Sequence, residues 1–179
     1  MRDIGFEPLA LKYRPKRFSD FIGQQATRVV LEKMCREGKM DRPMVFAGVK
    51  GTGKTSAGRV VAAALNCEDL DSGMPCTKCP SCISIANGTS TDVIEQDGAS
   101  SGLVDDIRKL TDMLRYSTSG RYRVLLLDEA QSLSKSAFNI GSSTAAWHAT
   151  HKDLQDINEQ IEKQEGLNTL ESLVLPKLT

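Results

Sequence analysis

The stretch "GVKGTGKT" constrains this chain more than any other, because it is typical of a strand, a phosphate-binding loop and a helix in succession. The preceding "PMVFA" has the character of a short buried strand, and the following "KTSAGRVVAAALN" that of a helix with an apolar stripe. Glycines allow backbone N–H groups to converge on phosphate oxygens, and the helix adds its positive N-terminal end. The pattern predicts a nucleotide-phosphate site formed by Gly48, Val49, Lys50, Gly51, Thr52, Gly53, Lys54, Thr55 and Ser56.

A second motif, "VLLLDEAQ", supplies the carboxylates that such a loop needs. We expect Lys54 to reach the β- and γ-phosphates, and the Thr55 hydroxyl and Asp128 to hold Mg²⁺. Glu129 would polarise the attacking water, so Lys54, Asp128 and Glu129 are the predicted catalytic residues for phosphoryl transfer to water. The alternative is that these acids only end a strand at the surface, and it is the order of the two motifs that favours catalysis.

The order of the predicted elements up to Asn139 indicates an α/β fold. After the loop and its helix, "TDVIEQD" is typical of a strand, "SGLVDDIRKLTDMLRY" of an amphipathic helix and "RYRVLLLDEAQSLS" of a buried strand. This alternation predicts a mainly parallel sheet with helices on its faces. We expect one nucleotide-binding domain over residues 1–139, and a tail over 140–179 that is either partly helical, through "HKDLQDINEQIEKQEG", or disordered.

Four of the five cysteines lie in one segment, "NCEDLDSGMPCTKCPSC". The two-residue gaps let neighbouring thiolates point at one ion, so Cys67, Cys76, Cys79 and Cys82 are candidate ligands of a closed, structural Zn²⁺ site. Disulfides are the competing interpretation, although nothing marks the chain as secreted. Cys35 lies in a helical stretch, and we expect it to be a buried apolar residue.

Charge and hydropathy give little further direction. Lys and Arg together number 23, as do Asp and Glu, so the net charge offers no global argument for binding nucleic acid. No apolar run approaches the length of a membrane span, and the first residues lack the core of a signal peptide. The prediction is a cytoplasmic protein without a membrane partner.

Together these motifs resemble the gamma/tau subunits of the bacterial DNA polymerase III clamp loader, which are AAA+ ATPases. The similarity runs from about Leu9 to Asn139 and includes "LALKYRPKRFSDFIGQ", "GVKGTGKTS", "PCTKCPSC", "DVIEQDGASSGLVDDIRKL" and "GRYRVLLLDEAQSLSKSAFN". The resemblance implies an AAA+ P-loop NTPase core that binds ATP and Mg²⁺, with an inserted zinc knuckle over residues 67–82. It also implies that Ala10, Pro15 and Ile22 lie against the adenine. Gln131 stands where the family more often has His.

The role that the resemblance implies is the loading of a sliding clamp onto primed DNA in DNA replication, together with other clamp-loader subunits. After "SKSAFN", however, the chain departs from the family. The family's next strand, its arginine finger, its helical lid and its collar domain are not recognisable, so we expect an incomplete C-terminal part and weak or absent independent hydrolysis. The alternative is a non-catalytic protein that inserts into a clamp-loader ring and blocks it. A helicase is disfavoured, because no basic or aromatic strand-gripping motif follows "DEAQ".

The missing strand creates a problem in the fold itself. In the family it lies between the strands of the two nucleotide motifs, and strands separated by that gap cannot share hydrogen bonds. Either the tail fills the gap or the sheet is distorted. The one candidate is "ESLVLPKL", with a short apolar run from Leu173 to Leu175, but Pro176 argues against it because proline tends to end or edge a strand. It stays open whether the tail is evolved structure or the product of a frameshift, a truncated gene or intron read-through.

Overall fold

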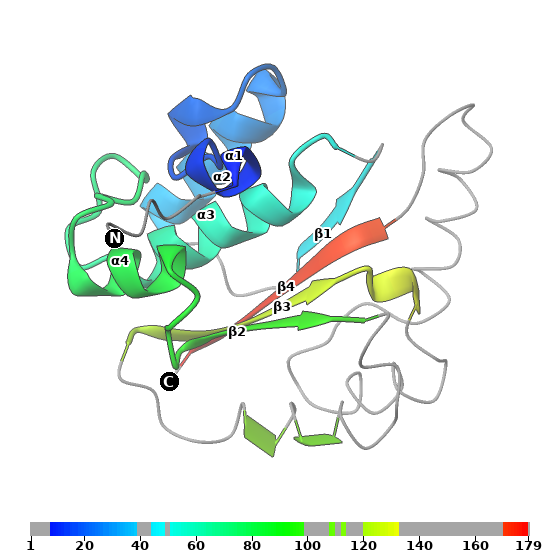
Figure 1. Cartoon of the computed structure of the whole chain (residues 1–179). Coiled ribbons are helices and arrows are strands. Elements are labelled where there is room, and N and C mark those ends of the chain that lie inside the picture. The colour runs from blue at the N-terminus through cyan, green and yellow to red at the C-terminus, as the bar shows by residue number, and fades with distance from the viewer. Residues whose placement is uncertain are drawn as a thin grey trace, which may run out of the picture.

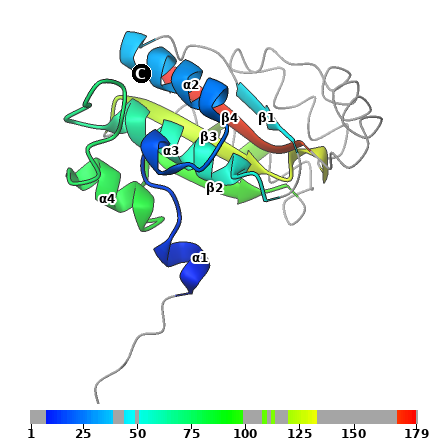
Figure 2. The same cartoon turned by 90° about the horizontal axis from the view of Figure 1, so that it is seen from above.

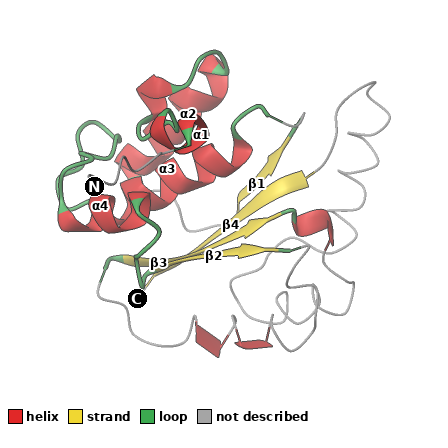
Figure 3. Ribbon diagram, in the orientation of Figure 1, coloured by secondary structure: helices red, strands yellow, loops and turns green. Residues whose placement is uncertain are grey.

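The computed structural model describes residues 8–38, 44–48, 51–98, 108–109, 112–113, 120–132 and 170–178. Its helices are α1 (Leu9–Lys12), α2 (Gln25–Glu37), α3 (Lys54–Asn66) and α4 (Pro80–Ala86), with short 3-10 turns at Phe18–Asp20 and Ala130–Ser132. Its strands are β1 (Met44–Ala47), β2 (Val93–Asp97), β3 (Tyr122–Asp128) and β4 (Leu170–Leu178). The four α-helices gather on one side of the sheet (Figures 1 and 3).

The helix α3 lies against the sheet between α2 and α4 (Figure 2). It begins at Lys54, directly after Gly53 at φ 89°, and ends where Cys67 turns to an extended conformation. Its alanines and valines suit close packing, and Val60 and Val61 are 2% and 0% exposed. These bounds confirm the helix that the sequence predicts.

The strand β3 forms the buried part of the sheet. Val124, Leu125, Leu126 and Leu127 are all at most 4% exposed, which confirms the predicted buried strand. Such a continuous apolar run is typical of a strand covered on both faces. β2 pairs with β3 in parallel, from Val93 opposite Val124 to Asp97 opposite Asp128. The two strands therefore bring their acidic ends to the same edge of the sheet.

The order of the sheet is β1-β4-β3-β2, so the tail occupies the gap between the two nucleotide motifs. Figure 1 shows β4, in red, between β1 and β3. β4 runs antiparallel to both neighbours, with Ser172 opposite Phe46 on one side and Asp128 on the other. The prediction of a mainly parallel sheet holds for β1, β2 and β3 and is wrong for β4, because a strand that only has to satisfy its neighbours' hydrogen bonds can enter in either direction.

Pro176 does not end β4, contrary to the argument from the sequence. The strand continues through Pro176 to Leu178, and Pro176 lies opposite Val124 of β3. The described pairing with β1, however, reaches only as far as Val174. On its β1 side, Pro176 therefore faces no strand among the described residues, and β4 is locally an edge there. Proline is tolerated at such an edge, where its missing N–H costs no ladder hydrogen bond.

A polar network fixes the end of α3 against the start of β3. The Asn66 side-chain oxygen accepts a hydrogen bond from the Tyr122 N–H at 2.9 Å, and Asp92 accepts one from the Gly120 N–H at 2.7 Å. A Cβ at Gly120 would lie 2.8 Å from the Asn66 oxygen, so this close approach requires glycine. The network sets the register between α3 and β3, and with it the distance between the residues at their other ends.

Some predictions fall outside the described residues. These are most of the helix expected over 101–116, of which only 108–109 and 112–113 are described and helical, and the tail helix expected over 151–166. Cys35 lies in α2 and is 7% exposed, as predicted. Among the described helices, none is long and apolar enough to cross a membrane.

Candidate functional site

The glycine-rich loop connects the end of β1 to the start of α3. Gly48 follows β1, and Gly53 precedes α3 with a left-handed φ of 89°. A Cβ at Gly53 would also lie 3.2 Å from the Phe21 ring, so glycine is needed here for conformation and for space. Val49 and Lys50 lie outside the described residues, whereas Gly51, Thr52 and Ser56 are placed along the loop and the first turn of α3.

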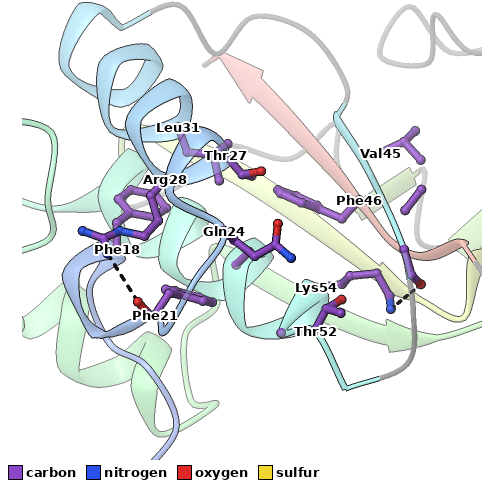
Figure 4. Close-up of a pocket in the computed structure, with 14 residues that line it drawn as sticks. Phe18, Phe21, Gln24, Thr27, Arg28, Leu31, Val45, Phe46, Thr52 and Lys54 are labelled. Carbon is purple, nitrogen blue, oxygen red and sulfur yellow. Dashed lines mark hydrogen bonds between the residues drawn. The ribbon is translucent and has the colours of Figure 1, made fainter. Parts of the chain in front are cut away.

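Lys54 is buried in the loop, with only 6% of its surface exposed. Its ammonium donates a hydrogen bond to the Gly48 carbonyl oxygen at 2.8 Å, across the loop (Figure 4). A buried ammonium requires such polar partners. The contact places a positive charge inside the turn, beside the glycines whose backbone conformation suits anion binding.

Thr55 and Asp128 meet although they are far apart in the sequence. The Thr55 hydroxyl lies 3.0 Å and 3.2 Å from the two carboxylate oxygens of Asp128. α3 supplies the hydroxyl from its first turn, and β3 supplies the carboxylate from its C-terminal end. Hydroxyl and carboxylate oxygens are the ligands that Mg²⁺ accepts, so this pair fits the ion predicted for it.

Glu129 follows Asp128 in a left-handed conformation, with φ 49°. The Glu129 backbone N–H donates a hydrogen bond to the Asp128 carboxylate at 3.2 Å, and Glu129 is exposed to solvent. The backbone is held from the β2 side, where the Gly98 N–H donates to the Asp128 carbonyl at 2.7 Å. A Cβ at Gly98 would lie 2.8 Å from the Glu129 carbonyl oxygen. The sequence gives no signal for this role of Gly98.

A cavity of about 480 Å³ opens beside the loop. Figure 4 shows that α2, β1 and the segment before α2 line it together with Thr52 and Lys54. Its apolar walls include Phe21, Phe46 and Leu31. Such a cavity is large enough for a small organic ligand next to the phosphate loop.

The residues expected to contact adenine are not brought to this cavity. Ile22 is fully exposed, Pro15 is half-buried and lines a different cavity, and Ala10 lies in α1. Two phenylalanines that sequence reasoning missed, Phe21 and Phe46, line the cavity instead. The local sequence gives no signal for either position.

The four cysteines form one cluster. The sulfurs of Cys67, Cys76, Cys79 and Cys82 all lie within 4.8 Å of one another, and those of Cys76 and Cys82 are 4.0 Å apart. A tetrahedral zinc ion with Zn–S distances of about 2.3 Å separates its sulfurs by about 3.8 Å. The cluster therefore fits Zn²⁺ with only a small contraction.

Backbone N–H groups point at the sulfurs of the cluster. Cys76 accepts from the N–H groups of Lys78 and Cys79, at 3.4 Å and 3.3 Å. These hydrogen bonds lower the pKa of the Cys76 thiol to about 7, and the one from the Lys78 N–H contributes most. Burial raises the pKa of Cys67 and Cys82. A metal cation among these sulfurs would offset the effect of burial by stabilising the thiolate forms, as expected for four cysteines that bind a metal.

Comparison with known proteins shows which proteins this chain is similar to. A family model described as DNA polymerase III, delta subunit, matches residues 23–140. The chain is 39% identical over 137 residues to DNA polymerase III subunit tau of Bacillus subtilis, covering 76% of this chain and 24% of that one. It is 38% identical over 137 residues to subunit gamma of Buchnera aphidicola, covering 76% and 37%. With subunit gamma/tau of Mycobacterium tuberculosis it shares 40% over 131 residues, covering 72% and 23%.

These matches confirm the resemblance to tau and gamma subunits for one segment of the chain. The chain spans roughly a quarter to somewhat over a third of the length of these three relatives. The matched residues 23–140 contain the glycine-rich loop, the cysteine cluster and β3, whereas β4 lies beyond them. The chain belongs to the DNA polymerase III, delta subunit, family.

Proposed function

We propose that the chain binds Mg-ATP at the loop between β1 and α3, as a clamp-loader ATPase subunit of the gamma/tau type does. The observation that supports this most is the contact of the Thr55 hydroxyl with the Asp128 carboxylate, 3.0 Å apart, next to the buried ammonium of Lys54. A hydroxyl, a carboxylate and an ammonium around one glycine-rich turn have little structural reason to converge. They are the groups that a magnesium-bound triphosphate requires.

In this proposal each group has a separate task. Backbone N–H groups of the loop and the Lys54 ammonium bind phosphate oxygens, and this positive charge favours the negative charge that builds up during transfer. Thr55 and Asp128 hold Mg²⁺, which neutralises phosphate charge when it is bound. Glu129 orients and polarises water from its exposed position after β3. The base would enter the cavity beside Phe21 and Phe46.

The wider role is proposed from the relatives and the resemblance. We infer an ATP-binding domain over residues 1–139, a zinc knuckle stapled by the four cysteines, and a tail over 140–179. Partners would be other clamp-loader subunits and the sliding clamp, with primed DNA reached through the assembly in the cytoplasm. Hydrolysis by the chain alone would be slow, since an arginine finger comes from a neighbouring subunit.

Thermal unfolding with and without Mg-ATP tests the nucleotide site. At a hundred times its dissociation constant, a ligand stabilises the folded state by about 2.7 kcal/mol. Lys54→Ala should lose the shift, measured against its own midpoint because the buried Lys54 also contributes to the fold. Lys33→Ala is the matched control, since Lys33 is an exposed lysine of α2 that pairs with Glu37 at 3.9 Å. An equal shift in the wild type and in Lys54→Ala contradicts the proposal.

A further inference from the structure

A second cavity, of about 520 Å³, lies on the part of α3 away from the phosphate loop. It is bounded by α1 and the residues after it, by the C-terminal half of α3, and by α4 with the adjoining knuckle. Among the described residues, it shares no lining residue with the cavity beside the glycine-rich loop. The two cavities are therefore distinct, although both contact α3.

The charged side chains that line this second cavity, called the groove below, are all positive. Arg14, Lys16 and Arg59 line it, and none of the described lining residues is Asp or Glu. The Nη1 atom of Arg14 is buried and has no hydrogen-bond partner in the part of the chain that the structure describes. Arg59 is bound to Glu95, which lies outside the lining. An unpaired guanidinium donor is costly to bury. Arg14 lines the groove and is only partly buried as a residue, so a rearrangement of its side chain would let an anionic ligand group complete it.

The remaining surface of the groove is mainly apolar. Val60 and Ile85 are buried at 2% and 7% exposure, whereas Leu11 and Ile83, which also line the groove, are 49% and 48% exposed. Exposed aliphatic side chains next to an unpaired cation suit a ligand with carboxylates and aliphatic groups side by side. A single nucleic-acid strand is disfavoured, because the groove offers bases no aromatic side chain to stack on within the part of the chain that the structure describes.

We propose that this groove, walled by α1, α3 and α4, is a docking site for an acidic peptide segment of a partner protein. One carboxylate of the segment pairs with Arg14, and an adjacent aliphatic side chain packs between Leu11 and Ile83. Lys16 at the rim attracts the segment's other acids. The occupant is defined by this chemistry, a run of Asp and Glu interspersed with Leu.

The test uses the full chain and a fluorescein-labelled peptide composed of Glu, Asp and Leu, followed by fluorescence anisotropy. Its twin, with Gln and Asn in place of the acids, should not bind. Arg14→Gln should weaken binding by about tenfold or more, the effect of losing a charge-assisted hydrogen bond. Lys12→Gln is the matched control: it removes the same charge from the exposed Lys12 of α1, which does not line the groove, and should leave binding nearly unchanged.

A second readout separates docking from a merely structural role of Arg14. Because its Nη1 is buried without a partner, Arg14→Gln should leave the thermal midpoint unchanged or raise it, whereas a structural role would lower it. Ile83→Glu places a like charge beside the ligand's acids, and it should also weaken binding by about tenfold. It tests the groove even if Arg14→Gln fails to fold.

Four results would overturn the proposal. Equal losses in Arg14→Gln and Lys12→Gln would mean unspecific attraction to basic residues. Displacement of the peptide by oligo-dT at lower concentrations than by unlabelled peptide would mean a nucleic-acid surface. Displacement by acetate with the affinity of the peptide would mean a small-anion site, and unchanged binding in Ile83→Glu would place the peptide elsewhere.

Discussion

β4 lies between β1 and β3 in the sheet. It differs from them because it comes from a part of the chain outside the residues that match the family. β1 and β3 fall within residues 23–140, which match the family, and each leads into a motif of the candidate nucleotide site. β4 comes from residues 170–178, beyond that match, and runs antiparallel to both. β1 and β3 position the side chains of the candidate site, whereas β4 connects the two strands by pairing with both.

The candidate site requires specific side chains, whereas the sheet requires only backbone hydrogen bonds between its strands. The positions of Thr55 and Asp128 depend on specific side chains at the ends of α3 and β3. The position of β4 depends on backbone hydrogen bonds, which most sequences can supply. A tail without family resemblance can therefore complete the sheet, provided that its N–H and C=O groups meet those of β1 and β3.

The largest effect should come from deleting residues 170–179. β1 and β3 would then face each other across an empty strand position, with buried backbone groups unpaired at a cost of about 1–3 kcal/mol each. Since total stabilities are about 5–15 kcal/mol, the loss of several such bonds should abolish cooperative unfolding. Circular dichroism during heating would measure this. A deletion variant that unfolds cooperatively near the wild-type midpoint would show that β4 is dispensable.

Removal of zinc should have a smaller and more local effect. Zinc purified with the protein under reducing conditions is expected, bound by the four cysteines. A strong chelator should melt the knuckle around Cys76 and leave α3 folded, because the cysteine cluster shares no buried residue with the main core and meets it only through the partly buried Leu70 among the described residues. Hydrogen exchange would follow residues 67–82 and 54–66 separately. Collapse of both segments together, or protein without bound zinc, would contradict this expectation.

Two proline changes in β4 should have smaller and unequal effects. Ser172 has a paired strand on each side, so its N–H faces a partner in either direction, and Ser172→Pro should cost about 2–3 kcal/mol. Among the described residues, Pro176 has a paired strand only on the β3 side, so Pro176→Ala should change the stability by less than about 1 kcal/mol. Urea denaturation measures both. Equal effects of the two variants would mean that β4 is not paired on both sides at Ser172.

The sequence predicted what depends on local patterns. The bounds of α3, the buried strand β3, and the approach of four cysteines follow from helical spacing, a continuous apolar run and two-residue gaps. It did not predict β4 in the centre of the sheet. Pro176 counted against β4 because proline tends to end or edge a strand. The described pairing of β1 stops at Val174 and leaves Pro176 at a local edge, and no sequence pattern shows this.

The candidate site divides in the same way. Lys54, Thr55 and Asp128 lie in motifs of fixed spacing, and the structure brings Thr55 and Asp128 into contact. The residues named for adenine were carried over from a resemblance, and Ile22 lies fully exposed to solvent. Phe21 precedes α2 and Phe46 lies in β1, so both reach the cavity only through the tertiary packing of these segments, which leaves no mark on local sequence.

The most direct test of β4 as the central strand is hydrogen exchange of the full chain, read from peptides that cover residues 170–178 and 122–128. If β4 pairs with β1 and β3, amides of both segments should exchange slowly and lose protection together as urea is added. Exchange of residues 170–178 at the rate of the unfolded chain, with residues 122–128 still protected, would contradict it. The sheet would then hold together without the tail.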